Sequence, residues 1–302
     1  MESVKLSRVR VIVVAKRSAL SRFQGGDGDA RTGRLLDAGH EAVRKWQPAH
    51  DQHVRVVEQV CEALDKAGAD TLILHGAQAE FDPQDAHLIV TVGGDGTLLA
   101  ASHNISNVPI LGVNSAPRYS VGFFCAAKGR SALSTLRKAL DGEVPVARLE
   151  RMAVRINGQL RSERILNEAL YCHAEPAATS NYILQVGRRR EEQKSSGFWV
   201  GPAAGSTAAI RSAGGRILPL TSNKLQLVVR EPYLGHGRAA KILRETVSGN
   251  GRIVAISKME RVSIFLDGPY RLLQARLGDE VSFERSKQPL FVVGLRRPRP
   301  NR

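Results

Sequence analysis

The chain of 302 residues contains only three cysteines, Cys61, Cys125 and Cys172, and they lie far apart. No CxxC pair is present, so the sequence excludes a disulfide framework and a zinc site of the cysteine type. The eight histidines are scattered without the spacing of metal ligands. We therefore expect no metal ion held by protein side chains alone.

Long apolar runs are also missing. No apolar segment approaches the ~20 residues that a membrane-spanning helix needs. The first apolar stretch is short, is interrupted by Lys16 and Arg17, and lacks a small-residue cleavage site. It is typical of a first strand rather than a signal peptide, and a cytoplasmic protein is the expectation.

The chain has few acids relative to its bases. Lys and Arg number 44 against 29 Asp and Glu, which gives a net charge of +15. No helix-turn-helix, zinc finger or RNA-binding aromatic signature accompanies this charge, so we expect no specific nucleic-acid binding. A basic surface also favours polyanionic small molecules such as nucleotides. The bases are spread along the chain, with dense runs at residues 187–194 and 294–302.

Strand and helix patterns alternate in the first half of the chain. Short β-branched runs predict strands, and apolar residues at helical spacing predict helices between them. This alternation predicts a parallel α/β domain over residues 1–145. The strands are expected at 8–15, 70–76, 86–92 and 108–114, the helices at 51–67, 98–105 and 131–143, and a glycine-rich loop at 24–34.

After residue 146 the pattern becomes mainly β. Short strands are expected at 151–158, 181–187, 224–232, 252–257 and 261–268, separated by turn signals such as ING and DGP. The basic run 187–194 is expected at a hairpin tip. We therefore predict a β-rich domain over residues 146–289, with the tail 290–302 free to return to the first domain, and a site in the crevice between the domains.

The segment VTVGGDGTLL carries the strongest chemical signal. Gly93, Gly94 and Gly96 let phosphate oxygens approach backbone N–H groups, and a helix starting near Thr97 offers its positive end to anions. Asp95 among phosphates makes sense as a proton acceptor or as a partner of Mg²⁺. The turn therefore indicates phosphoryl transfer; the alternative is a plain connection with Asp95 as a local cap. It matches neither a Walker A loop nor GxGxxG.

The segment GGDGD at residues 25–29 is similar in sequence to the GGDGT turn but differs in its flanking residues. No apolar strand leads into it, and no helical pattern follows closely. We expect Asp27 to play no part in catalysis.

Together with three later segments, the GGDGT turn resembles the NAD kinase family, whose turn is shared with lipid and phosphofructo-type kinases. These segments are ILGVNSAPRYSVGFF (110–124), ILNEALYCH (165–173) and SSGFWVGPAAGSTAAIRSAGG (195–215), in the family's order. The form AAGSTAA, with NSAP in place of Asn-Thr-Gly, is similar to the plant NADH kinase and animal mitochondrial NAD kinase branch. The resemblance implies a phosphofructokinase-like α/β domain followed by a β-rich dinucleotide-binding domain.

The family resemblance also implies roles for single residues. Asp95 would take the proton of the adenosine ribose 2′-hydroxyl as it attacks the γ-phosphate of ATP, while Gly93, Gly94, Gly96 and Thr97 lie along the phosphates. Asn167 would bind the adenine or ribose, and ionised Glu168 would accept hydrogen bonds from ribose hydroxyls. Asn114 would contact substrate or shape its loop. The dinucleotide would lie against Ala204, Gly205, Ser206, Thr207 and Ala208.

The resulting expectation is an ATP- and Mg²⁺-dependent kinase that converts NAD or NADH into NADP or NADPH, as a homodimer or larger homo-oligomer. Two alternatives stay open. One is a lipid kinase of the diacylglycerol or sphingosine type on the same scaffold, although no amphipathic membrane helix is present. The other is a dinucleotide- or nucleic-acid-binding protein without activity. Asp267 is expected to serve a hairpin turn, and Ser206 to cap a helix.

Overall fold

The computed structural model describes residues 9–128, 131–233 and 240–295. The chain forms two compact units. Unit 1 comprises Met1–Ala147 with Phe291–Arg302, and unit 2 comprises Arg148–Leu290. The boundary expected after residue 145 lies two residues before the observed one.

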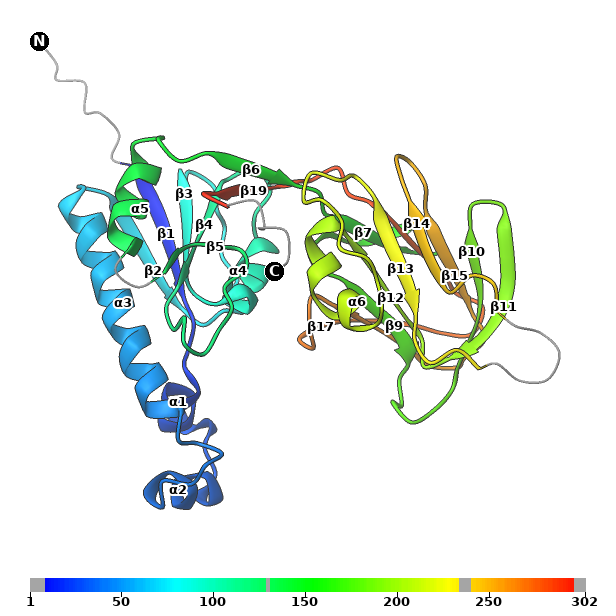
Figure 1. Cartoon of the computed structure of the whole chain (residues 1–302), viewed down its shortest axis with the longest axis horizontal. Helices are drawn as coiled ribbons and strands as arrows, with labels where there is room; N and C mark the ends of the chain where they lie inside the picture. The colour runs from blue at the N-terminus through cyan, green and yellow to red at the C-terminus, as the bar shows by residue number, and fades with distance from the viewer. Residues whose placement is uncertain (1–8, 129–130, 234–239, 296–302) are drawn as a thin grey trace, which may run out of the picture. The chain divides into compact units, whose positions relative to one another are not determined.

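Unit 1 is built on a seven-stranded sheet with the strand order β2-β1-β3-β4-β19-β6, and β5 pairs with β4 (Figure 1). Strands β1 to β5 run parallel, as β-branched runs connected by helices require. Strand β19 pairs with β4 and brings residues 290–293 into this sheet. The strands are β1 (Arg10–Ala15), β2 (Asp70–His75), β3 (Leu88–Gly93), β4 (Ile110–Asn114), β5 (Cys125–Lys128), β6 (Val146–Leu149) and β19 (Leu290–Val293).

Helices cover both faces of this sheet. Figure 1 shows α3 and α5 on one side and α4 on the other. Val60 and Leu64 of α3 and Leu136 of α5 are fully buried in the core cluster of the first face. The helices of unit 1 are α1 (Ala19–Arg22), a π-helical turn (Phe23–Asp27), α2 (Ala30–Asp37), α3 (Trp46–Lys66), α4 (Asp95–Ser102) and α5 (Ser131–Leu140). This is a doubly wound α/β arrangement, as expected.

Three expectations for unit 1 are wrong, one for a loop and two for the start of a helix. The segment 24–34 is largely helical instead of a loop, because Asp29 accepts the N–H of Thr32 at 2.6 Å and caps α2. Helix α3 begins five residues before the expected start, at Trp46. Helix α4 begins at Asp95 rather than residue 98, since Gly94 is already its N-cap.

Unit 2 consists of two six-stranded sheets, ordered β11-β10-β15-β18-β7-β8 and β14-β13-β12-β9-β16-β17. One hydrophobic core joins their inner faces, and in it the Phe198 ring contacts the rings of Tyr171, Tyr182 and Phe283. The elements are β7 (Met152–Ile156), β8 (Gln159–Ile165), β9 (Ala169–His173), β10 (Ser180–Val186), β11 (Arg189–Ser195), β12 (Phe198–Pro202), a 3₁₀ helix (Ala203–Thr207), α6 (Ala209–Ser212), β13 (Leu225–Val229), β14 (Arg244–Val247), β15 (Ile253–Ser257), β16 (Val262–Leu266), β17 (Arg271–Ala275) and β18 (Glu280–Arg285).

The basic run 187–194 belongs to a hairpin, as expected, but most of it is strand β11 rather than the hairpin tip. Only Gly187 and Arg188 form the turn, and Gly187 has a positive φ of 61°. Strand β11 pairs with β10 alone at the end of its sheet. Charged side chains on an edge strand discourage pairing with another chain, which accounts for this composition without a ligand.

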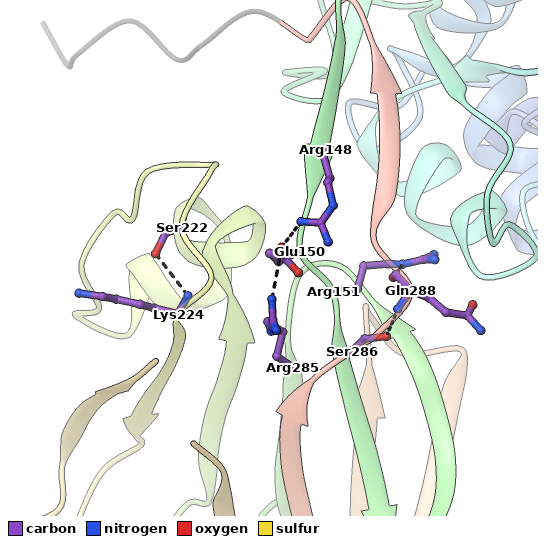
Figure 2. A network of polar contacts seen from close by, with 8 residues as sticks. All are labelled: Arg148, Glu150, Arg151, Ser222, Lys224, Arg285, Ser286 and Gln288. Atoms are coloured by element: carbon purple, nitrogen blue, oxygen red, sulfur yellow. Dashed lines mark hydrogen bonds and ion pairs between the residues drawn. The ribbon is translucent and has the colours of Figure 1, made fainter. Parts of the chain in front are cut away.

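Polar contacts tie together the first and last segments of unit 2 (Figure 2). The buried Glu150 accepts a hydrogen bond from Arg148, and Arg285 lies 3.8 Å from the same oxygen. The fully buried Arg151 donates from Nε to the Gln288 carbonyl at 2.7 Å. Because a buried charge without partners costs several kcal/mol, these contacts hold the two segments in register.

Candidate functional site

The glycine turn, residues 93–97, connects the end of β3 to the start of α4. A β-carbon at position 93 would lie 2.1 Å from Thr97 Oγ1, and one at position 94 would lie 2.3 Å from Ser120 Oγ. Position 93 therefore needs glycine, because the Thr97 β-carbon itself would lie 2.7 Å away, whereas at position 94 the Ser120 hydroxyl would have to rotate. Gly96 is different, because it is exposed and a β-carbon there would meet no protein atom within 4 Å.

Asp95 is half-buried, and its carboxylate binds a distant segment rather than capping its own helix. Oδ2 accepts the N–H of Phe123 and Oδ1 accepts the N–H of Phe124, both at 2.8 Å. A carboxylate has about four acceptor positions, so each oxygen can accept a further proton or ligand. Asp95 thus fixes the loop after β4, and each of its oxygens keeps an acceptor position for a proton or a ligand.

Asn114, at the end of β4, is fully buried and shapes its own loop. Its amide nitrogen donates to the Ser120 carbonyl at 3.0 Å, and its amide oxygen accepts the N–H of Ala116 at 3.1 Å. Both ends of the amide are engaged, so the structure supports the loop-shaping alternative over a direct substrate contact.

His53 on α3 is a residue of this region that the sequence did not single out. It is buried, with Nδ1 2.9 Å from Ser115 Oγ in the loop after β4. Burial, followed by the charge of Lys16, lowers the pKa of His53 to about 4. A neutral imidazole therefore ties α3 to this loop. No spacing pattern marks His53, because its partner lies 62 positions away.

In unit 2, Asn167 and Glu168 lie between β8 and β9, and Asp267 fixes their backbone. The Asp267 carboxylate accepts the N–H groups of Leu166 at 3.0 Å, Asn167 at 2.7 Å and Glu168 at 3.3 Å. The Asp267 N–H donates back to the Glu168 carbonyl at 2.9 Å. Asp267 was expected to serve only a local hairpin turn, but its side chain also binds residues about 100 positions earlier in the chain.

The side chains of Asn167 and Glu168 carry buried oxygens without partners. Among the described residues, Asn167 Oδ1 and Glu168 Oε2 accept no hydrogen bond. Burial, followed by the charge of Asp267, raises the pKa of Glu168 to about 8. The protonated acid therefore predominates at neutral pH, which differs from the ionised group expected from the sequence. Buried polar atoms without partners are rare and point to a missing ligand or water.

The 3₁₀ helix Ala203–Thr207 packs directly on Asn167. A β-carbon at position 205 would lie 1.7 Å from the Asn167 carbonyl oxygen, and one at position 201 would lie 2.2 Å from it. Only glycine permits this approach. Residues 166–168, residues 203–208 and Asp267 therefore form one group, which we call the three-segment site.

The members of the 203–208 segment differ in accessibility. Ser206 is fully buried; it donates to the Ala203 carbonyl at 2.7 Å and accepts the N–H of Leu218 at 2.9 Å. Its expected role as a helix N-cap is wrong, because the cap positions are Pro202 and Ala208. Ala204 is buried, whereas Thr207 and Ala208 are half-buried and open to a ligand.

Within residues 9–128, 131–233 and 240–295, no group of three or more His, Cys, Asp or Glu side chains has the arrangement of a metal site. In the same part of the chain, no helix has both the length and the apolar composition to cross a membrane.

Known proteins match both units. Residues 30–144 match the family model of the ATP-NAD kinase N-terminal domain. A probable NADH kinase of Oryza sativa subsp. japonica is 32% identical over 265 residues, which cover 80% of this chain and 81% of the rice protein. The NADH kinase of Arabidopsis thaliana is 33% identical over 239 residues, which cover 70% of this chain and 74% of the plant protein.

The fold also matches a solved structure. The crystal structure of an NAD kinase from Archaeoglobus fulgidus in complex with ATP superposes with a TM-score of 0.65 and 21% identity, covering 93% of this chain and 92% of that chain. At this identity the likeness shows the fold alone. The extended similarity to the two plant proteins carries the assignment: the chain belongs to the NAD kinase family, in which its similarity supports the plant NADH kinase branch.

Proposed function

We propose that this protein is a kinase that transfers the γ-phosphate of ATP to the 2′-hydroxyl of the adenosine ribose of NAD or NADH, which forms NADP or NADPH. The names of the plant relatives support an acceptor of this class. We assign the phosphate chemistry to the glycine turn with Asp95 in unit 1 and adenosine binding to the three-segment site in unit 2.

The observation that carries this proposal is the pair of buried oxygens without partners in the three-segment site. Asn167 Oδ1 and Glu168 Oε2 lie next to a glycine-containing segment that packs on Asn167. An adenosine offers hydroxyl and amino donors to such oxygens, and half-buried Thr207 and Ala208 offer contact to a flat base. A diacylglycerol has a single hydroxyl donor, which cannot satisfy both oxygens, and this disfavours an acceptor of that class.

In the proposed reaction, Asp95 accepts the proton of the ribose 2′-hydroxyl. The hydroxyl oxygen forms a bond to the γ-phosphorus, the bond from that phosphorus to the β,γ-bridging oxygen breaks, and ADP leaves. Backbone N–H groups at the start of α4 favour the negative charge of the transferred group. Catalysis is mainly positioning and charge neutralisation, to which a general base adds about 10²–10⁴-fold.

We propose that the reaction uses Mg²⁺, and Asp95 is the group in this site that suits the ion. Mg²⁺ is commonly held by one or two carboxylates together with substrate phosphates and water. Asp95 supplies one such carboxylate with free acceptor positions, and the described residues contain no three-ligand cage. The ion would therefore arrive with ATP and neutralise charge on the phosphates.

The test is a coupled assay with ATP and Mg²⁺ that compares NAD and NADH as acceptors, with an NADP-specific dehydrogenase as detector. Phosphorus NMR of the product distinguishes a 2′-phosphate from a 3′-phosphate. We expect the 2′-phosphate, in a reaction abolished by a chelator. Phosphorylation of sphingosine or diacylglycerol without any NADP(H) would contradict the proposal.

We also propose that the protein acts as a homodimer or a larger homo-oligomer, on the basis of the family resemblance. Light scattering coupled to gel filtration measures the mass directly. A mass of 32.9 kDa, that of one chain, at assay concentration would refute this part of the proposal.

A further inference from the structure

Unit 1 contains a cavity of about 400 Å³ with a basic lining. Lys16, Lys45 and Arg118 supply the charge, Trp46 and Tyr119 supply aromatic surface, and Ser18 supplies a hydroxyl. We call this the basic cavity. Its volume lies within the range of small-molecule sites.

The basic cavity lies where the chain order of the sheet reverses. From β1 the chain continues through α3 to β2 on one side, whereas from β3 it continues through α4 to β4 on the other. In doubly wound folds, ligands bind beyond the carboxyl ends of the strands at this reversal. Lys16 directly follows β1, and its N–H donates to the Val92 carbonyl of β3 at 3.0 Å.

The opposite wall of the basic cavity is also connected to the glycine turn. Arg118 and Tyr119 belong to the loop after β4, and the next residue, Ser120, packs on Gly94. The same loop is held by Asp95 through Phe123 and Phe124. Both walls therefore flank the turn that carries the proposed general base.

The charges of the basic cavity lack counter-ions within the part of the chain that the structure describes. Among the described residues, neither Lys16, Lys45 nor Arg118 forms an ion pair. Burial lowers the pKa of the Lys16 amine, which means that its charged form is held at a cost. An anion in the cavity would offset this cost and the repulsion among the three cations.

We propose that the basic cavity binds the phosphate chain of the phosphoryl donor, a nucleoside triphosphate, with the Trp46 and Tyr119 rings against its base. This inference rests on the proposed kinase function and assigns the donor to named residues of unit 1. Three cations at one site suit a polyphosphate, and an aromatic ring suits a purine. Inorganic polyphosphate shares the phosphate chemistry but cannot use the rings.

The two tryptophans of the chain, Trp46 and Trp199, make a direct test possible. In a Trp199→Phe protein, Trp46 is the remaining tryptophan, and it lines the basic cavity and the neighbouring pocket around Phe23. Titration with ATP then needs neither NAD nor turnover, and the charge-reversal variants below distinguish the two pockets. We expect quenching by ATP, competition by tripolyphosphate, and weaker competition by adenosine. Competition by adenosine but not by tripolyphosphate would overturn the proposal, and so would ATP binding without any change in Trp46 fluorescence.

Charge reversal then tests the cations. Lys45→Glu and Arg118→Glu are changes at exposed positions, so we expect folding to be retained. Each should raise the KM for ATP at least about tenfold, equivalent to about 1.4 kcal/mol, with the KM for NAD within twofold. Lys138→Glu, at an exposed position on α5, makes the same change in net charge and should alter neither KM.

The outcomes separate this inference from the proposed function. NADP(H) formation with an unchanged KM for ATP in both cavity variants would overturn the donor assignment and leave the kinase function intact. ATP binding at Trp46 without phosphorylation of NAD or NADH would refute the kinase function and support the cavity as a nucleotide site. An equal rise in KM for ATP in Lys138→Glu would overturn the cavity assignment in favour of a general charge effect.

Discussion

The glycine turn of unit 1 and the three-segment site of unit 2 hold their carboxylates in different ways. Asp95 is half-buried, and each of its oxygens accepts a backbone N–H group. Glu168 is buried, has one oxygen that no described residue contacts by a hydrogen bond, and has a pKa raised to about 8. Both oxygens of Asp95 are thus engaged with the backbone of a neighbouring loop, whereas Glu168 is held at a cost to stability, which is typical of a residue kept for binding.

The largest effect we expect comes from Asp95→Asn. Loss of the proposed base should lower kcat by about 10³-fold. Asparagine can accept only one of the two N–H groups of Phe123 and Phe124, so the free energy of unfolding should also fall by about 1 kcal/mol. Steady-state kinetics and thermal unfolding measure both.

Asp27→Asn is the matched control for that experiment, because Asp27 has the same neighbours in sequence but belongs to a π-helical turn rather than a strand–turn–helix. We expect its kcat to stay within twofold of the wild type. A full loss of activity in Asp27→Asn, or wild-type turnover in Asp95→Asn, would contradict the roles assigned to the two turns.

A smaller effect is expected from Asp267→Ala, which removes the acceptor of three backbone N–H groups in unit 2. The KM for NAD should rise by about 10–100-fold, since an unpaired buried N–H group costs about 1–3 kcal/mol. The KM for ATP should change by less than twofold, because the donor is assigned to unit 1.

Asp279→Ala controls for loss of a turn acid in the same unit. Asp279 accepts the N–H of Arg276 at 2.7 Å and the amide of Asn157 at 2.8 Å, away from Asn167. We expect it to lower the melting temperature and leave both KM values unchanged. Equal rises in the KM for NAD in both variants would mean that Asp267 acts only through overall stability.

Alanine substitutions at Gly205 and Gly96 should affect the two regions differently, because Gly205 makes room for Asn167 whereas Gly96 has no protein neighbour there. Gly205→Ala places a β-carbon 1.7 Å from the Asn167 carbonyl oxygen, and we expect a loss of about 2–3 kcal/mol in stability together with weaker NAD binding. Gly96→Ala meets no protein atom within 4 Å, so stability should be retained. If phosphates approach Gly96, only the KM for ATP should rise.

A Gly96→Ala protein with an unchanged KM for ATP would remove Gly96 from the phosphate site. A Gly205→Ala protein with unchanged stability would show that the contact with Asn167 is not tight in solution. Calorimetry and separate titrations of the two substrates distinguish these cases.

The two regions also differ in how much of them can be predicted from sequence. The glycine turn is formed by consecutive residues, with β3 before it and α4 after it. The sequence around Asp95 therefore predicts that Asp95 lies between a strand and a helix. The partners of Asp267 lie about 100 residues earlier, and no spacing rule connects them. The same holds for Ser206, whose hydroxyl oxygen accepts the N–H of Leu218, a contact 12 positions away that no sequence pattern predicts.

Helix limits were predicted less well for a physical reason. The helical spacing of apolar residues in α3 starts at Val54, whereas the helix itself starts at Trp46. Trp46 does not follow that spacing because its side chain lines the basic cavity. The segment 24–34 reads as a loop by its glycines, yet the Asp29 cap makes α2 form there. Caps and cavities act through single contacts, which periodicity does not register.

The remaining predictions concern the pH dependence of stability alone, and its sign is opposite in the two units. Burial raises the pKa of Glu168 from 4.5 to about 8, so the folded protein holds a proton that the unfolded chain loses. This contribution to stability is complete below pH 4.5 and is lost as the pH rises through 8. Glu168→Gln cannot ionise and should be more stable than the wild type at pH 8, by on the order of 1–3 kcal/mol.

His53 in unit 1 gives the reverse. Its pKa is lowered from 6.5 to about 4, so its contribution to stability is present above pH 6.5 and is lost as the pH falls through 4. His53→Gln should therefore flatten the acid side of the stability profile, while Glu168→Gln flattens the alkaline side. Thermal unfolding of both variants between pH 4 and 9 measures this, and a change on the same side in both would show that the two groups do not titrate as their burial implies.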